Sequence, residues 1–292
     1  MSRDLRLYRT AVSDNRRWGD FSHRPGDIFV CTPPKCGTTW TQTIIASLLW
    51  SNGPAPGPVM VLSPWLEAEF NDSGEILARL EAQRHRRFIK SHTPADGIPI
   101  FDDASYVFVA RDGRDAFMSY CNHFEKFKND LRVSLNERAA SEGIPPMPDW
   151  DGDVHGFFAR WLQQAALLHH VATFWELRGR ANLLLVHFAD LKRDLAGEMR
   201  RIAAFLEIDV PEARWPAVVA RCTFDAMKSR ADEIGTFWNF EGGAQSFLFK
   251  GTNGRWHDVL TPAELEAYRQ KVAEVLPAEA ARWLEQGAHA DR

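Results

Sequence analysis

The chain has 292 residues, a length at which one α/β domain is common, and its hydrophobic (45%) and charged (25%) fractions argue against a disordered or fibrous protein. The net charge of −4 gives no general attraction to nucleic acid, and no run approaches the roughly 20 apolar residues of a membrane span. We therefore expect a single domain over residues 1–292, with no nucleic-acid partner and no transmembrane segment.

The first ten residues and the cysteines predict a soluble, cytoplasmic protein. Residues 1–10 carry charges where a signal peptide needs an apolar core. The basic cluster from Arg84 to Lys90 is short and is interpreted as a solvated edge. Neither a disulfide nor a metal site is predicted, because there is no C-x-x-C pairing and no zinc-type spacing with histidine around Cys31, Cys36, Cys121 and Cys222.

Strands and helices alternate along the chain. Apolar residues recur at helical spacing at 38–50, where they lie on one face of the segment, and again at 195–206. Each of these segments is expected to be a helix. The stretches 129–153 and 229–255 are irregular and are interpreted as lids or pocket walls. The alternation predicts an α/β fold with a central parallel sheet flanked by helices. Its buried strands are expected at 27–32, 105–110 and 182–188.

The segment CTPPKCGTTW at 31–40 has the features of a phosphate-binding turn between a strand and a helix. The positive end of the helix dipole, backbone N–H groups and the Lys35 ammonium converge on one point, so an anion is expected there. Gly37 lets the backbone approach closely, and the hydroxyls of Thr38 and Thr39 can cap the helix and donate to phosphate. The alternative is an ordinary capped helix start.

This turn is not a Walker A loop, because Lys35 precedes Gly37 and no second glycine lies upstream. It resembles the 5′-phosphosulfate loop T-Y-P-K-S-G-T-T-W of the sulfotransferases, with Cys36 in place of Ser. That family uses 3′-phosphoadenosine 5′-phosphosulfate (PAPS) as sulfuryl donor. The resemblance implies a P-loop-like fold and PAPS contacts from Lys35, Cys36, Gly37, Thr38 and Thr39.

A second segment, 105–119, resembles the 3′-phosphate motif of the same family, a strand, then R-[DN]-P-[RK]-D, then Ser. Arg111 and Ser119 match this pattern. Arg111 at a strand end can fork onto phosphate oxygens, and Ser119 about two turns later can donate to the same group. Without the first motif, a surface ion-pair cluster from Arg111 to Asp115 would explain these residues equally well.

A third segment, 247–256, is similar to the Gly-rich nucleotide loop F-x-R-K-G-x-x-G-D-W, and Lys250 and Gly251 match it. Phe249 takes the place of an arginine that in the family grips the 3′-phosphate, so weaker binding is implied unless Lys250 and the Gly251 amide compensate. A Gly-rich surface turn is the alternative.

The resemblance also implies an adenine site. Trp40 is the stacking ring, Phe224 its opposite face, and Cys222 stands where the family often has Thr. Phe188 keeps the ring of a family Tyr without its hydroxyl. Core packing would explain each of these residues taken alone.

The string K-[ST]-H-x-P within RFIKSHTP resembles the catalytic strand end of the family. It implies that His92 is the general base, which is worth about 10² to 10⁴ in rate, and that Lys90 is a cation near the transferring sulfonate. Lys35 is assigned to the bridging oxygen of the leaving group, where negative charge develops. No metal is required. A structural histidine is the alternative for His92.

Cys36 carries a separate hypothesis. A thiol at a helix N-terminus beside Lys35 is expected to be partly ionised and reactive. The alternative is a cysteine that merely replaces a small serine.

The expected acceptor is a hydroxyl on an apolar body, either a small alcohol, a phenol, or a lipid or glycolipid. Aromatic residues of the irregular stretches are the candidates for its pocket: Trp65, Phe70, Trp150, Trp238 and Phe240. The animal dimer motif K-x-x-x-T-V-x-x-x-E is degraded, with His257 and Pro262 in place of Lys and Val, so the choice between monomer and dimer stays open.

Two other functions remain as alternatives. An ATP-dependent phosphotransferase would need a Walker-type lysine and an aspartate for Mg²⁺, and only Asp112 and Asp190 come close. A nucleotide-binding protein without catalysis would have no use for His92.

Overall fold

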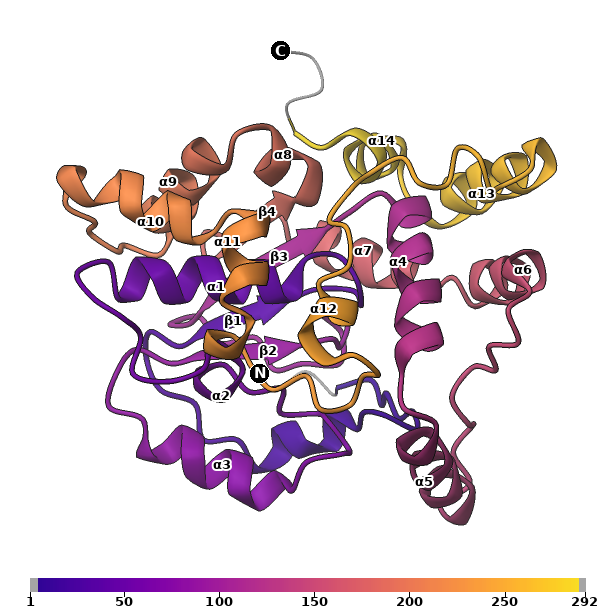
Figure 1. Cartoon of the computed structure of the whole chain (residues 1–292), viewed down its shortest axis with the longest axis horizontal. Helices are drawn as coiled ribbons and strands as arrows, with labels where there is room; N and C mark the ends of the chain where they lie inside the picture. Colours follow the sequence, from indigo (N-terminus) through magenta and orange to yellow (C-terminus); the bar gives the residue numbers. More distant parts are fainter. Residues whose placement is uncertain (1–4, 289–292) are drawn as a thin grey trace.

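The computed structural model describes residues 5–288 as one α/β domain built on a parallel sheet (Figure 1). The predicted fold class is confirmed, and the three predicted strands end within one residue of the observed ones. Residues 1–4 and 289–292 of the predicted domain lie outside the described residues. The spatial order is β2-β1-β3-β4, with β1 at Ile28–Cys31, β2 at Phe88–Ser91, β3 at Ser105–Ala110 and β4 at Leu183–His187.

Strand β2 is absent from the strands predicted from apolar runs, although the resemblance of RFIKSHTP implies a strand end there. The interpretation of 84–90 as a solvated edge is wrong at Arg87. Arg87 is 2% exposed, and its guanidinium donates to both carboxylate oxygens of Asp27, at 2.8 and 2.5 Å. The residue type alone does not tell whether an arginine is solvated or buried in an ion pair, so the burial of Arg87 can be inferred only from its partner.

The helices surround the sheet. The predicted helices at 38–50 and 195–206 are confirmed as α1 and α9. The α-helices are α1 (Thr38–Leu49), α2 (Val59–Leu62), α3 (Ser73–Ala82), α4 (Gly113–Lys126), α5 (Asn129–Ser141), α6 (Val154–Gln164), α7 (Ala166–Glu176), α8 (Phe188–Arg193), α9 (Leu195–Phe205), α10 (Trp215–Arg221), α11 (Phe224–Ser229), α12 (Gly243–Phe247), α13 (Pro262–Val275) and α14 (Ala278–Gln286). Short 3₁₀ helices lie at η1 (Asn15–Asp20), η2 (Glu212–Arg214) and η3 (Ala231–Glu233).

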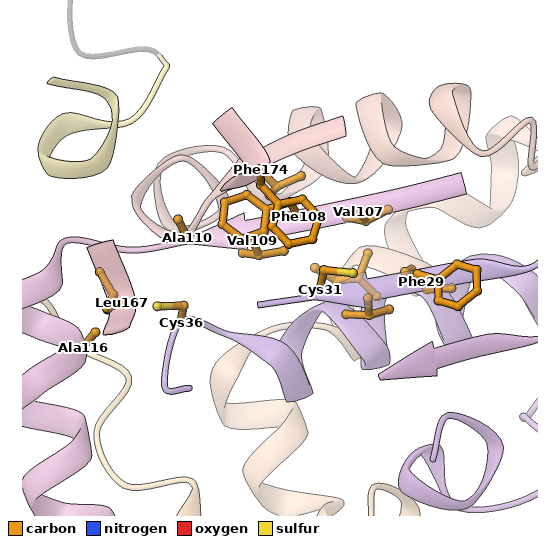
Figure 2. Packing of buried hydrophobic residues seen from close by; sticks show 14 of the residues in the cluster. Phe29, Cys31, Cys36, Val107, Phe108, Val109, Ala110, Ala116, Leu167 and Phe174 are labelled. Carbon is orange, nitrogen blue, oxygen red and sulfur yellow. The ribbon is translucent and has the colours of Figure 1, made fainter. Parts of the chain in front are cut away.

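Both faces of the sheet are covered. Helix α1 packs on β1 and β2 and also contacts α9, while α7 lies behind the sheet (Figure 1). Phe174 of α7 stacks on Phe108 of β3 (Figure 2), and their ring centroids are 4.3 Å apart. The single apolar face predicted for α1 is too narrow, because polar residues such as Thr41 and Gln42 are buried as well.

The expectation that 129–153 is irregular is wrong over the range of α5. Only Leu135 and Ala139 of that helix are buried, so its apolar period is too weak to detect. The stretch 229–255 contains only the short helices η3 and α12.

The four strands are parallel, so their carboxyl ends meet at one edge. The residues that directly follow them are Thr32 after β1, His92 after β2, Arg111 after β3 and Phe188 after β4. Residues separated by up to 156 positions are thereby brought to one place.

Candidate active site

The turn between β1 and α1 requires glycine at its last position. Gly37 is the N-cap residue of α1 with a φ of 105°, and a Cβ there would lie 2.9 Å from the Phe188 ring. Lys35 also has a positive φ, of 70°. No side chain caps α1, so its first backbone N–H groups are available to an anion.

The predicted capping of α1 by threonine hydroxyls is wrong. The hydroxyl of Thr38 instead lies 2.5 Å from that of Thr32, at the end of β1. Thr38 and Thr39 both line the cavity beside the turn.

Lys35 is a cation without a counter-ion. Its Nζ lies 4.5 Å from the centroid of the Phe247 ring, and no carboxylate forms a salt bridge with it anywhere in 5–288. Burial, together with the charges of Lys90 and Arg111, lowers the pKa of Lys35 to about 7. A bound anion would restore the charge of this ammonium.

His92 is held in one tautomer by the neighbouring strand end. Its Nδ1 donates to the carbonyl oxygen of Thr32 at 2.7 Å, which leaves the lone pair on Nε2. Burial and the charge of Lys90 lower the pKa of His92 well below its usual value, so the ring is neutral. The ring packs edge-on against Trp65 at 4.9 Å, and the Nζ of Lys90 lies 4.5 Å from the same indole. Burial lowers the pKa of Lys90 to about 8.

Sequence reasoning missed Glu67, which holds this strand end in place. Its Oε1 accepts hydrogen bonds from the hydroxyls of Ser91 (2.5 Å) and Thr93 (2.9 Å), on either side of His92, and from Trp18 Nε1 (2.9 Å). Burial raises the pKa of its carboxyl. The one available signal was an acidic residue after Trp65-Leu66, with Glu69 close behind it, which no pattern rule would single out.

Arg111 joins the end of β3 to the Gly-rich loop. Its Nη2 donates to the Thr252 carbonyl and to Asn253 Oδ1, both at 2.8 Å. Its guanidinium carbon lies 4.3 Å from the centroid of the Phe188 ring. In the described part of the chain its buried Nε has no partner. Gly251 in this loop has a φ of 61°, and a Cβ there would lie 2.6 Å from the Phe224 ring.

The predicted adenine residues lie together, with one exception. Trp40 meets the Phe188 ring edge-on at 5.2 Å, and both line the cavity with Phe224. Cys222 is fully buried and does not line the cavity, but its carbonyl accepts a hydrogen bond from Trp40 Nε1 at 2.7 Å. Its contribution is to orient Trp40.

One cavity of about 1110 Å³ contains the remaining predicted site. Every predicted catalytic or donor-binding residue lines it except Cys36 and Cys222. Cys36 is fully buried among apolar side chains near Ala110, Ala116 and Leu167 (Figure 2). Burial raises the pKa of its thiol to about 12, so the prediction of a partly ionised, reactive thiol is wrong.

The other end of the cavity is aromatic. Trp65, Phe70 and Trp238 form a run of edge-on contacts at 5.7 and 6.2 Å, and Phe240 also lines the wall. Trp150 does not line it and packs on Phe157 instead, so its assignment to the pocket is wrong.

Several cavity residues carried no recognisable signal in the sequence. His123 of α4 packs edge-on against Phe240 at 4.8 Å, and burial lowers its pKa well below the usual value. Tyr8 comes from a segment far from the motifs, and Arg255 lies within the Gly-rich segment 247–256, at the position where the motif has Asp. Their place in the wall depends on how distant loops fold over the sheet edge.

Comparison with known proteins decides the family. A model described as "Sulfotransferase domain" matches residues 25–278. The chain belongs to the sulfotransferase family. A glycolipid sulfotransferase of Mycobacterium bovis (strain BCG / Pasteur 1173P2) is 33% identical to this sulfotransferase, over 97% of this chain and 95% of the relative.

Solved structures show the same fold. The mouse sulfotransferase SULT7A1, complexed with PAP, superposes with a TM-score of 0.75 at 21% identity, covering 97% of this chain and 99% of that one. A retinol dehydratase in complex with androsterone and the inactive cofactor PAP superposes with a TM-score of 0.66 at 19% identity, over 95% and 88% of the two chains. This sulfotransferase is an enzyme with the P-loop-like fold of that family.

The segment 257–266, which aligns with the animal dimer motif, contains the start of helix α13 in this sulfotransferase. Thr261 caps α13 in a capping box with Glu264, and Pro262 is its first residue. Within residues 5–288, no helix is long and apolar enough to cross a bilayer.

We predict that native Cys36 reacts slowly with iodoacetamide at neutral pH, with or without nucleotide. Its thiol is buried, and the raised pKa leaves little thiolate. Peptide mass spectrometry should show labelling roughly 100-fold slower than in the urea-unfolded chain, which is the control. Equal rates in the two states would contradict the burial of this thiol.

Proposed function

We propose that this enzyme transfers a sulfuryl group from PAPS to the hydroxyl of an acceptor with an apolar body. One observation carries the proposal. The four cations that the sequence assigned to the site all line the cavity, and none of them forms a salt bridge with a carboxylate in the described chain: Lys35, Lys90, Arg111 and Lys250. Cations without counter-ions in a partly buried cavity favour a ligand with several negative charges, and PAPS carries charge at both its 5′ and 3′ ends.

The donor assignment has independent support. A mouse sulfotransferase of the same fold was solved with PAP, the product that PAPS leaves after losing its sulfuryl group. The 5′ end would bind at the turn, where Gly37 permits close approach and the N–H groups of α1 are free. Lys35, Thr38 and Thr39 complete this end.

The 3′-phosphate and the adenine of the donor would be bound by separate sets of residues. Arg111 at the end of β3 lies next to the Gly-rich loop, so the 3′-phosphate would bind between Arg111, Ser119 and the loop residues Lys250 and Gly251. The adenine would bind among the rings of Trp40, Phe188 and Phe224.

His92 would act as the general base. The acceptor oxygen attacks sulfur, its proton passes to the unprotonated Nε2, and the bond from sulfur to the bridging phosphate oxygen breaks to release PAP. The Thr32 carbonyl keeps Nε2 free, and stabilises the imidazolium that forms through the Nδ1–H bond. Lys35 and Lys90 counter the charge that develops on the leaving oxygen and the sulfonate.

Among acceptors, a glycolipid has the best support. The cavity is large, and its acceptor end is walled by Trp65, Phe70 and Trp238. An apolar tail fits such a wall, while a sugar hydroxyl would reach His92. The relative from Mycobacterium bovis bears the name glycolipid sulfotransferase.

The donor proposal predicts selective stabilisation by adenosine 3′,5′-bisphosphate (PAP). At 100 times its Kd, this ligand should add about 2.7 kcal/mol to the free energy of unfolding, because it binds only the native state. Thermal shift with PAP, AMP and ATP at equal concentration measures this effect. Stabilisation by ATP alone would support a phosphotransferase and contradict the proposal.

The base proposal predicts that His92→Ala abolishes turnover and leaves PAP affinity within about threefold of wild type. A general base acts on the acceptor proton and not on the nucleotide, and its loss costs about 10² to 10⁴ in rate. Initial rates with PAPS and calorimetric PAP titration provide the two readouts. His155→Ala, an exposed histidine paired with Glu264 outside the cavity, is the matched control. Full activity in His92→Ala would remove His92 as the base.

The lowered lysine pKa values predict that PAP binding weakens as pH rises. Lys35 and Lys90 have pKa values of about 7 and 8 in the free chain, and the bound phosphates raise them. Binding therefore takes up protons above pH 7, and Kd should rise by up to about tenfold per pH unit for each lysine that loses its charge. Calorimetry in buffers of different ionisation enthalpy detects the uptake, and Lys35→Ala should reduce it. A Kd that is constant from pH 6.5 to 9 would contradict the assignment.

A further inference from the structure

Arg255 is a cation of the cavity wall to which no role has been given. It lies in the loop between α12 and α13, half-buried, and lines the cavity. Its Nη2 donates to Asn122 Oδ1 at 3.3 Å, which is a long and weak hydrogen bond. No carboxylate forms a salt bridge with it in the part of the chain that the structure describes. Most of its N–H donors are therefore free for a ligand.

The position of Arg255 relates it to the end of the cavity that contains Arg111. Asn122, its hydrogen-bond partner, lies three residues after Ser119 on α4, which is the same face of that helix. Both α4 residues line the cavity. Arg255 is also close enough to Arg111 that its charge adds to burial in lowering the pKa of Arg111. Two guanidinium groups that repel each other in the free chain are expected to share an anion.

Arg111 cannot supply all the donors for a phosphate. Its Nη2 is already committed to the Thr252 carbonyl and to Asn253 Oδ1. These bonds hold the Gly-rich loop against β3 and would be lost if Nη2 turned to a ligand. A second guanidinium on the same loop removes this conflict, because Arg255 lies two residues after the tethered Asn253.

Phe249 provides the support for this second guanidinium. Its ring lies 5.2 Å from the guanidinium carbon of Arg255 and also 5.2 Å from the Nζ of Lys250. Contacts of this length with an aromatic ring are attractive for cations and restrict where they lie. An apolar residue at position 249 thus gathers two cations around it at the cavity wall.

We propose that Arg255 binds the 3′-phosphate of the donor, together with Arg111 and Ser119, and that the ring of Phe249 orients it. The planar guanidinium of arginine matches two phosphate oxygens at once. This inference rests on the proposed use of PAPS. It concerns only the discrimination between nucleotides with and without a 3′-phosphate.

The test compares PAP with AMP, which lacks the 3′-phosphate, by calorimetric titration of the full chain. In Arg255→Ala the Kd for PAP should rise about tenfold to hundredfold, the usual effect of losing a charge-assisted contact. The Kd for AMP should change less than about twofold, and this unchanged affinity also shows that the variant is folded. The double variant Phe249→Arg/Arg255→Ala should recover most of the PAP affinity, because it returns a guanidinium to the same wall.

The control is Arg269→Ala, which removes an exposed arginine of α13 that pairs with Glu266 and does not line the cavity. It should leave both affinities unchanged. An Arg255→Ala variant that loses no PAP affinity, or loses PAP and AMP affinity equally, would overturn the inference if the wild type prefers PAP. A wild type with no preference between PAP and AMP would instead overturn the proposed donor.

Discussion

The parallel pairing of β1 with β2 on one side and β3 on the other is the constraint on which the site depends. Val30 pairs with Lys90 and with Val107, so β1 and β2 end at the same level and β3 continues for two more residues. The Thr32 carbonyl then lies next to the His92 ring and fixes its tautomer. The same edge receives the turn before α1 and the guanidinium of Arg111. A change of one residue in the register of β2 would move His92 to the opposite face of the sheet.

The electrostatic character of the site comes from partly buried lysines that form no salt bridge in the described chain. Burial lowers the pKa values of Lys35 and Lys90, and the charges of Lys90 and Arg111 lower that of Lys35 further. This arrangement costs stability in the free protein, and an anionic ligand recovers it. The buried Glu67 counters part of the charge of Lys90 and also holds Ser91 and Thr93 on either side of His92. The protein therefore combines a buried carboxylate, one oxygen of which accepts three hydrogen bonds, with cations that form no salt bridge in the described chain.

The Gly-rich loop shows how a substitution is understood from its surroundings. In the sequence, Phe249 stands where the family motif has an arginine, which implies only a loss of hydrogen-bond donors to the 3′-phosphate. In the folded chain the ring lies between Lys250 and Arg255, and the loop is tied to the sheet by Arg111 and to α8 by Lys192, whose Nζ donates to the Gly251 carbonyl at 2.7 Å. The consequence of the substitution depends on these neighbours, which come from segments distant in the chain.

The sequence by itself determined the α/β class, three of the four strands, helices α1 and α9, and the turn with Gly37 that joins β1 to α1, because periodicity, glycine and helix ends act over a few residues. It could not determine β2, whose buried Arg87 needs Asp27 as a partner, or helix α5, which buries only two residues. Only the tertiary structure decided that Cys36 and Cys222 are buried behind the cavity, that Trp150 lies away from it, and that Glu67 and Arg255 lie at the site. The physical reason is that burial, pKa and hydrogen-bond partners depend on groups that are far away along the chain, and no local pattern of residues records them.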